Sequence, residues 1–302
     1  MTPADAVSQT EPAVSAGTFG ERLNGAFDRF GRLCVGIDPH SWLLTEWGLP
    51  DTAAGAERFG RLVVEASAGL VGIVKPQVAF YERFGSAGYL ALERVLSDAR
   101  AAGLLVIADV KRGDLGTSVE AYGQAWLTPG SPLEADAITL NPYMGVGSLA
   151  STIALATDAH KGLFLLAATS NPEAAALQQA ILAGGAQAGR TVAASVLDQV
   201  QAINSAATSA AGMGSIGVVL GATVALADFG IDIHAPSTAV TTPVLAPGFG
   251  HQGANSTDVA SLFGGYAQGV IVSESRSVLS AGPHHVADEI TRRVTEAGAT
   301  RG

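Results

Sequence analysis

The sequence predicts an α/β protein, a single-domain (β/α)8 (TIM) barrel with lengthened loops. Eight short apolar runs alternate along the chain with stretches of helical spacing. Continuous apolar runs of this length are typical of strands buried on both faces, as in parallel sheets. Because strand and helix alternate from end to end, βα units are expected, and eight of them favour a closed barrel over an open doubly wound sheet.

Each expected strand is rich in Val, Ile and Leu and ends at Gly, Pro, Asp, Asn, Lys or Ser. In chain order the expected strands are 33–37, 71–76, 104–110, 137–141, 163–169, 216–222, 243–248 and 269–273. Expected helices between them include 56–67, 86–101, 117–126, 191–205 and 259–266. Two regions, 40–55 and 172–215, exceed the barrel minimum. We interpret both as insertions on one domain, because neither has enough strand signal for a second core.

Composition excludes several classes of protein. The chain has 302 residues, 48% of them hydrophobic, which is enough to bury a large core. Its net charge of −10, from 17 basic and 27 acidic residues, argues against nucleic-acid binding. No run of 18 apolar residues occurs, so no membrane span is expected. The single cysteine, Cys34, excludes an intrachain disulfide and a thiolate zinc cluster.

The amino-terminal residues are expected to form a loose segment. Residues 1–20 lack a basic region followed by an apolar one, so we expect them to form a flexible tail and not a signal peptide. The barrel domain is expected over 21–302. These features predict a cytoplasmic protein.

The expected third strand carries the most informative charges. Asp109 and Lys111 end an apolar run and are two residues apart, so on a strand their side chains face the same way. Buried charges are costly unless paired, and Lys75 on the neighbouring strand adds a second ammonium group. Asp114 follows a turn at Gly113 and can return to complete an alternating Lys–Asp–Lys–Asp set. The alternative is a charge network that only ties two strands together.

A second constellation follows the last two strands. The loop at 246–253, Ala-Pro-Gly-Phe-Gly-His-Gln-Gly, lets backbone N–H groups approach an anion. Arg276, at the end of the last strand, is a bidentate donor suited to phosphate, and barrels commonly bind phosphate in these loops. An ordinary glycine-rich turn beside a surface arginine is the alternative.

Two serines are weaker candidates. Ser170 begins the sequence Ser-Asn-Pro-Glu, and Ser118 lies within Thr117-Ser118-Val119-Glu120; both sequences fit a helix capping box, which alone would explain the two serines. The six histidines have no metal-ligand spacing, and a Gly-x-Gly-x-x-Gly match at 248–253 follows the wrong strand for a dinucleotide fold. We therefore expect neither a metal nor a cofactor.

From residue 27 to about residue 279 the chain resembles orotidine 5'-phosphate decarboxylases of the longer bacterial subgroup called type 2. The resemblance lies in the segments VGIDPH (35–40), VKPQVAFYERFG (74–85), DVKRGDLGTS (109–118), NPYMG (141–145), ATSNP (168–172), APGFGHQG (246–253) and Ser-Arg-Ser (275–277). The Asp-x-Lys-x-x-Asp pattern alone is shared with relatives that act on sugar phosphates. The resemblance implies a TIM barrel that converts orotidine 5'-phosphate to UMP and CO2, the last step of de novo pyrimidine biosynthesis.

The resemblance also implies roles for the charged residues. Lys111 would donate the proton to C6 of the pyrimidine, and Asp109 would sit against the scissile carboxylate. Lys75 and Asp114 would complete the charged network and hold the ribose. Because the family counterpart of Asp114 reaches the partner subunit's site, a homodimer with shared active sites is implied.

Substrate-binding roles follow in the same way. Asp38 would bind ribose hydroxyls, and Ser170 would contact the pyrimidine. Gln252 and Arg276 would grip the phosphate. Ser118 stands where the family is expected to have Thr, and it keeps the hydroxyl for a ribose or phosphate contact.

Two alternative functions stay open at this point. One is a magnesium-dependent relative such as a β-keto sugar-phosphate decarboxylase or a hexulose-phosphate synthase, although Lys75 would repel the metal. The other is a non-catalytic protein that binds nucleotide phosphates, which would have no use for four alternating charges.

Overall fold

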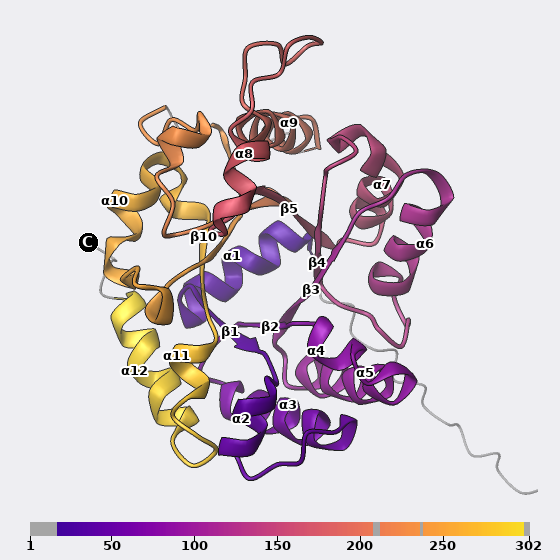
Figure 1. The fold of residues 1–302 in the computed structure, drawn as a ribbon, viewed down its shortest axis with the longest axis vertical. Helices are drawn as coiled ribbons and strands as arrows, with labels where there is room; N and C mark the ends of the chain where they lie inside the picture. The colour runs from indigo at the N-terminus through magenta and orange to yellow at the C-terminus, as the bar shows by residue number, and fades with distance from the viewer. Residues whose placement is uncertain (1–16, 208–211, 236–237, 299–302) are drawn as a thin grey trace, which may run out of the picture.

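The computed structural model describes residues 17–207, 212–235 and 238–298. Eight parallel strands of the described chain close into a barrel in the order β1-β10-β9-β7-β5-β4-β3-β2, which confirms the predicted fold class (Figure 1). The barrel strands are β1 (Leu33–Ile37), β2 (Ile73–Pro76), β3 (Leu105–Arg112), β4 (Ala137–Leu140), β5 (Gly162–Ala168), β7 (Ile216–Leu220), β9 (Val244–Pro247) and β10 (Val270–Glu274). Residues 1–16, most of the expected tail, lie outside the described residues.

Helices surround the barrel (Figure 1). They are α1 (Phe19–Phe30), α2 (Ser41–Glu46), α3 (Ala53–Ser67), α4 (Ala79–Glu82), α5 (Gly85–Ala101), α6 (Gly116–Leu127), α7 (Ala150–Asp158), α8 (Ala175–Gln178), α9 (Val192–Ala207), α10 (Val259–Phe263), α11 (Arg276–Leu279) and α12 (Val286–Gly298). None of the helices in the described ranges is long and apolar enough to cross a membrane.

All eight predicted strands are present, with ends that move by at most two residues. The helix expected over 259–266 is shorter: α10 ends at Phe263 and a 3-10 turn follows. Gly264 has φ +48°, and a Cβ there would lie 2.2 Å from the Ile233 carbonyl oxygen, so the chain turns at this glycine. The region 172–215 also holds a short strand, β6 (Gly212–Met213), which pairs with β8 (Val240–Thr241) outside the barrel.

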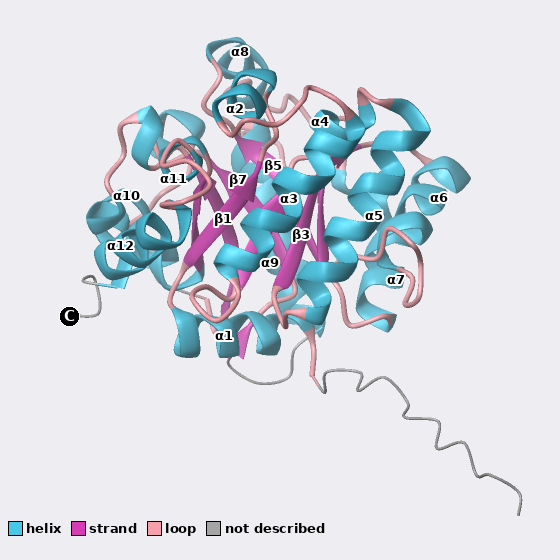
Figure 2. Cartoon of the chain, turned by 90° about the horizontal axis from the view of Figure 1, so that it is seen from below, coloured by secondary structure: helices cyan, strands magenta, loops and turns pink. Residues whose placement is uncertain are grey.

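The barrel interior is closed at one end by α1 (Figure 2). The helix begins with a capping box, in which Thr18 and Glu21 satisfy each other's backbone N–H groups. Its Phe19 ring meets Phe164 of β5 edge-on, with ring centroids 6.0 Å apart. Inward side chains from all eight strands pack against the apolar face of α1: Cys34, Ile73, Ile107, Ala137, Phe164, Val219, Leu245 and Ile271. Arg22 of α1 also pairs with Asp136, just before β4.

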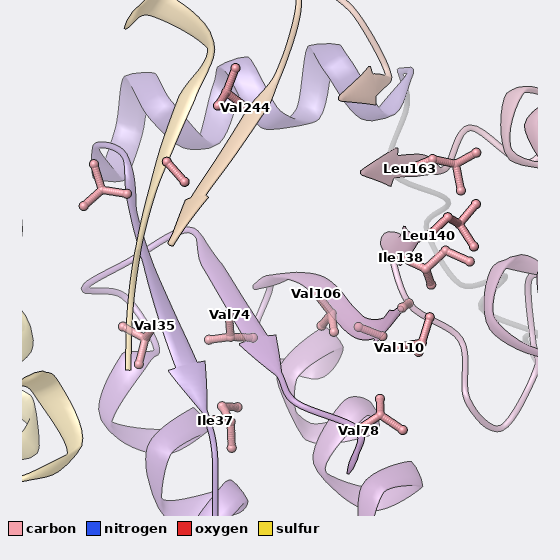
Figure 3. Packing of buried hydrophobic residues seen from close by; sticks show 14 of the residues in the cluster. Val35, Ile37, Val74, Val78, Val106, Val110, Ile138, Leu140, Leu163 and Val244 are labelled. Carbon is pink, nitrogen blue, oxygen red and sulfur yellow. The ribbon is translucent and has the colours of Figure 1, made fainter. Parts of the chain in front are cut away.

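A larger apolar cluster lies between the strands and the surrounding helices (Figure 3). Val35, Val74 and Val106 belong to it and point away from the barrel axis, while their sequence neighbours point inward. Strands buried on both faces explain why the sequence shows continuous apolar runs instead of alternation. The rigid barrel that results presents its carboxyl-terminal strand ends as the platform for a site.

Candidate active site

A cavity of about 990 Å³ opens at the carboxyl ends of the strands. Of the predicted site residues, seven line it: Asp38, Lys75, Asp109, Lys111, Ser170, Gln252 and Arg276. They follow or end β1, β2, β3, β5, β9 and β10. The closed barrel thus brings together residues that are up to 238 positions apart in the sequence, between Asp38 and Arg276.

The charged cluster forms the layer of inward-facing side chains next to the apolar interior of the barrel. Ile73, Ile107 and Ala137 form part of the apolar interior, and the residues two positions later, Lys75, Asp109 and Thr139, face the same way. The next layer of the barrel is therefore polar. All three of these side chains are buried, and all three line the cavity.

Asp109 accepts four hydrogen bonds from side chains. Its Oδ2 accepts from Lys75 Nζ at 3.1 Å and from Gln77 Nε2 at 3.0 Å. Its Oδ1 accepts from Lys111 Nζ at 2.6 Å and from Thr139 Oγ1 at 2.8 Å. Burial by itself raises the pKa of Asp109, but the ammonium groups of Lys75 and Lys111 outweigh that effect and hold the pKa well below its usual range. Asp109 is therefore an anion at neutral pH.

Lys75 is protonated for the complementary reason. Burial opposes its charge, but the carboxylates of Asp109 and Asp38 raise its pKa above the ordinary lysine value. A buried charge pair of this kind is retained only when both members are satisfied, because removing one leaves the other unpaired. The cluster therefore carries a fixed positive charge beside a fixed negative one.

Lys111 has an unusual backbone. Its φ of 46° lies in the left-handed region, and the β3–β4 register shifts between Ala108 and Arg112. The Lys111 N–H donates to Thr139 Oγ1 at 2.9 Å, which holds this conformation. Left-handed backbone at a residue other than glycine costs of order 1–3 kcal/mol and clusters at functional sites. Its side chain is 47% exposed, so the ammonium group reaches from the buried Asp109 into the open cavity.

Asp38, at the edge of the same cavity, has one unsatisfied carboxylate oxygen. Its Oδ1 is buried and has no hydrogen-bond partner among the described residues, although the residue lines the cavity. A buried carboxylate oxygen without a donor is costly, and a hydroxyl group of a ligand would supply that donor.

The loop after β9 and the end of β10 form the opposite wall. Gly248, Gly250 and Gly253 all have positive φ. Gly250 is required twice over, since a Cβ there would lie 2.6 Å from Glu274 Oε2. Gln252 Oε1 lies 3.5 Å from Ser170 Oγ across the cavity. Among the described residues no carboxylate lies within 4.0 Å of the Arg276 guanidinium, whose charge is thus available to an anion.

The cap interpretations of the two serines are wrong. The turn after Ser170 has Asn171 as its N-cap, and α6, which contains Ser118, has Leu115; neither cap makes a side-chain hydrogen bond. Ser170 instead lines the cavity. Ser118 is exposed in the first turn of α6 and does not line it.

Asp114 is not brought to the cluster within this chain. Its Oδ1 accepts from the Leu115 N–H at 2.8 Å, and the residue does not line the cavity. The alternating set of four charges is therefore reduced to three in one chain. At the turn, Gly113 packs against the Asn141 carbonyl oxygen, which a Cβ on Gly113 would meet at 2.4 Å.

Sequence reasoning missed two residues that bond to Asp109. Gln77 lies two positions after Lys75, and Thr139 is the single hydroxyl in the apolar run of β4. Both have the inward spacing of the residues that were found. The signal that could have found them is the alternation of strand side chains: a residue two positions after an inward-facing one also faces inward.

Comparison with known proteins places this site in a family. Residues 31–289 match the model of the orotidine 5'-phosphate decarboxylase / HUMPS family. The orotidine 5'-phosphate decarboxylase of Salinispora arenicola is 49% identical over 266 residues, covering 88% of this chain and 91% of that protein. The enzyme of the same name from Streptomyces coelicolor is 46% identical over 265 residues, covering 88% and 91%.

Solved structures agree with the sequence matches. A crystal structure from Streptomyces avermitilis, provisionally assigned as an orotidine 5'-phosphate decarboxylase, is 44% identical with a TM-score of 0.85, covering 94% of this chain and 95% of that one. The Leishmania donovani OMP decarboxylase is 26% identical with a TM-score of 0.68, covering 92% and 98%. From these matches, the chain belongs to the orotidine 5'-phosphate decarboxylase family and is an enzyme of the carboxy-lyase class.

Proposed function

We propose that this chain decarboxylates orotidine 5'-phosphate to UMP and CO2, the last step of de novo UMP biosynthesis. The observation that carries the proposal is the buried Asp109 carboxylate held between two ammonium groups, on the floor of a cavity whose wall holds Arg276, which has no carboxylate partner in the described ranges. A dianionic phosphate at Arg276 and a carboxylate above Asp109 are the two ends of this substrate.

The chemistry demands a strong electrostatic device. Loss of CO2 from orotate leaves a carbanion at C6 with no electron sink, so the required barrier reduction lies at the upper end of the ~8–23 kcal/mol that enzymes supply. The Lys111 ammonium reaches into the cavity and would stabilise the developing charge, then protonate C6. The breaking bond is C6–carboxylate, its electron pair stays on C6, and the proton comes from Lys111.

Asp109 would act on the carboxylate that leaves. Because Asp109 stays ionised, it repels the substrate carboxylate and repels the neutral CO2-like transition state less. Lys75 would hold Asp109 in place and, with Asp38, would bind the ribose hydroxyls. The unsatisfied Asp38 Oδ1 supports that assignment.

The remaining contacts would orient the ends of the substrate. Ser170 would contact the pyrimidine, while Gln252 and Arg276 would bind the phosphate, and the 3.5 Å between Ser170 Oγ and Gln252 Oε1 places the two binding regions side by side. Binding energy from the phosphate, remote from C6, would be used to close the glycine-rich loop.

We also propose a homodimer with shared sites. Asp114 and Ser118 lie outside the cavity of their own chain, so any catalytic role for them needs a second subunit. Large apolar side chains are exposed around them, namely Leu115, Tyr122, Tyr143 and Met144. An exposed apolar group of this kind is typical of a protein interface. The cytoplasmic location stays a prediction, supported by the pathway.

The magnesium-dependent relatives in the same family are the main alternative. Both oxygens of Asp109 already accept from ammonium groups, and a divalent cation would have to displace them. A non-catalytic phosphate-binding protein is the other alternative, and observed turnover would exclude it.

The test is the loss of orotidine 5'-phosphate absorbance on addition of purified protein in buffer with EDTA. Conversion to UMP in the chelator supports the proposal and removes both alternatives. A folded, dimeric sample without conversion would refute it, and hexulose-phosphate and keto sugar-phosphate substrates with Mg²⁺ would then be assayed.

A further inference from the structure

The segment between β5 and α9 is fastened to the end of β5 by one side chain. β5 ends at Ala168, whose carbonyl accepts from the Gly221 N–H at 2.8 Å as the last bond of the ladder. The next N–H, that of Thr169, donates at 2.8 Å to Oε1 of Gln178, which is the last residue of α8. Gln178 thus supplies the acceptor that the barrel no longer provides.

The same amide makes a second bond in the opposite sense. Gln178 Nε2 donates to Thr169 Oγ1 at 3.0 Å, and the Thr169 hydroxyl donates to Asn171 Oδ1 at 2.8 Å. Gln178 therefore both accepts from and donates to one residue. An amide is the side chain that can do this, because a carboxylate only accepts.

Ser170 is the residue whose place this arrangement fixes. It lies between Thr169 and Asn171, both members of the hydrogen-bonded set, and it lines the cavity. Gly221 approaches it from the other side, since a Cβ on Gly221 would lie 3.3 Å from the Ser170 nitrogen. Ser170 is thus held between β7 and α8.

We propose that Gln178 is a positioning residue, which sets Ser170 against the pyrimidine by bonding to Thr169. The inference rests on the proposed function, in which Ser170 contacts the base. This proposal gives the segment 172–191 a role, because α8 within it carries the side chain that holds the carboxyl end of β5 in place. Gln178 itself acts through Thr169 and Ser170.

Two readouts test the proposal. Hydrogen–deuterium exchange of the Thr169 amide should be faster in Gln178→Leu, which has similar size and neither bond, than in the native chain. Gln178→Glu can still accept from the Thr169 N–H and should show a smaller change. Gln179→Leu is the matched control, because the adjacent Gln179 does not line the cavity and makes no side-chain hydrogen bond within the described part of the chain.

The second readout is kinetic. Gln178→Leu should lower kcat/KM for orotidine 5'-phosphate by about tenfold, the equivalent of one to two net hydrogen bonds. In a Ser170→Ala background the same substitution should have little further effect, since the two residues act as one unit. A purely structural role would lower kcat/KM by the same factor in both backgrounds.

Either of two results overturns the proposal: unchanged Thr169 exchange in Gln178→Leu, or fully additive losses in the double variant. Thermal unfolding of each variant excludes general misfolding. The exchange measurement needs no substrate, so it tests the Gln178–Thr169 contact even if the native chain does not turn over orotidine 5'-phosphate. Lack of turnover by the native chain would refute the proposed function and would leave the exchange result to decide the role of Gln178.

Discussion

Replacing Thr139 with valine should remove the hydroxyl group that links the backbone of Lys111 to the carboxylate of Asp109. Valine has nearly the shape of threonine and suits a strand, so the change removes a hydroxyl and little else. That hydroxyl makes two bonds: Oγ1 donates to Asp109 Oδ1 at 2.8 Å and accepts from the Lys111 N–H at 2.9 Å.

The magnitude follows from those two bonds. A hydrogen bond to a charged group is worth about 1.5–3 kcal/mol, and an ordinary one contributes about 1 kcal/mol. The left-handed backbone of Lys111, at φ 46°, then loses the contact that holds it. We expect Thr139→Val to lower the free energy of unfolding by about 2–4 kcal/mol, and to lower kcat by at least about tenfold because the Lys111 ammonium is misplaced.

Urea denaturation measures the first quantity and steady-state turnover of orotidine 5'-phosphate measures the second. Thr139→Ser keeps the hydroxyl and is the matched control, with kcat expected near the native value. If Thr139→Val retains native kcat and native stability, the argument that Thr139 positions Lys111 is refuted. If Thr139→Ser loses as much activity as Thr139→Val, keeping the hydroxyl gives no rescue, and the argument is refuted in the same way.

Three further outcomes are expected. Lys111→Ala should abolish turnover and leave the fold intact by circular dichroism, because its side chain is 47% exposed; substantial residual activity would exclude it as the proton donor. Arg276→Ala should raise KM and lower kcat/KM strongly, whereas unchanged kinetics would remove Arg276 from the phosphate site. Cys34 should resist iodoacetamide at pH 9 in the native protein and react once the protein is unfolded. Burial raises the pKa of this thiol from 9.0 to about 12, so the reactive thiolate is about a thousandfold scarcer, and native alkylation detected by mass spectrometry would contradict that shift.

The strands could be predicted well because a two-sided burial requirement leaves a direct trace in the sequence. Each barrel strand must be apolar on both faces, so it stands out as an apolar run, and charges that end such a run are conspicuous. Asp109, Lys111 and Lys75 were predicted in this way, and in the structure both ammonium nitrogens lie within 3.1 Å of a carboxylate oxygen of Asp109.

The remaining parts of the site leave a weaker trace. A threonine in a strand is common, so nothing in β4 marks Thr139 as a partner of Asp109. The left-handed φ of Lys111 runs against the preference of its residue type and arises from the register shift beside β4. The position of Asp114 depends on how Gly113 packs against Asn141, a contact between distant elements that no local turn rule contains.

The helix α1 has a consequence for the time course of synthesis. Its partners lie far along the chain, since Arg22 pairs with Asp136 and the Gly20 N–H donates to Ser215, 195 residues later. At translation rates of ~5–20 residues per second, Ser215 follows Gly20 by roughly 10–40 s. During that interval the barrel end that the phenylalanine-bearing face of α1 covers is incomplete, because β7, β9 and β10 have not yet been made. Of the described helices, α1 is synthesised first, yet its packing is complete only after the last barrel strand has been made.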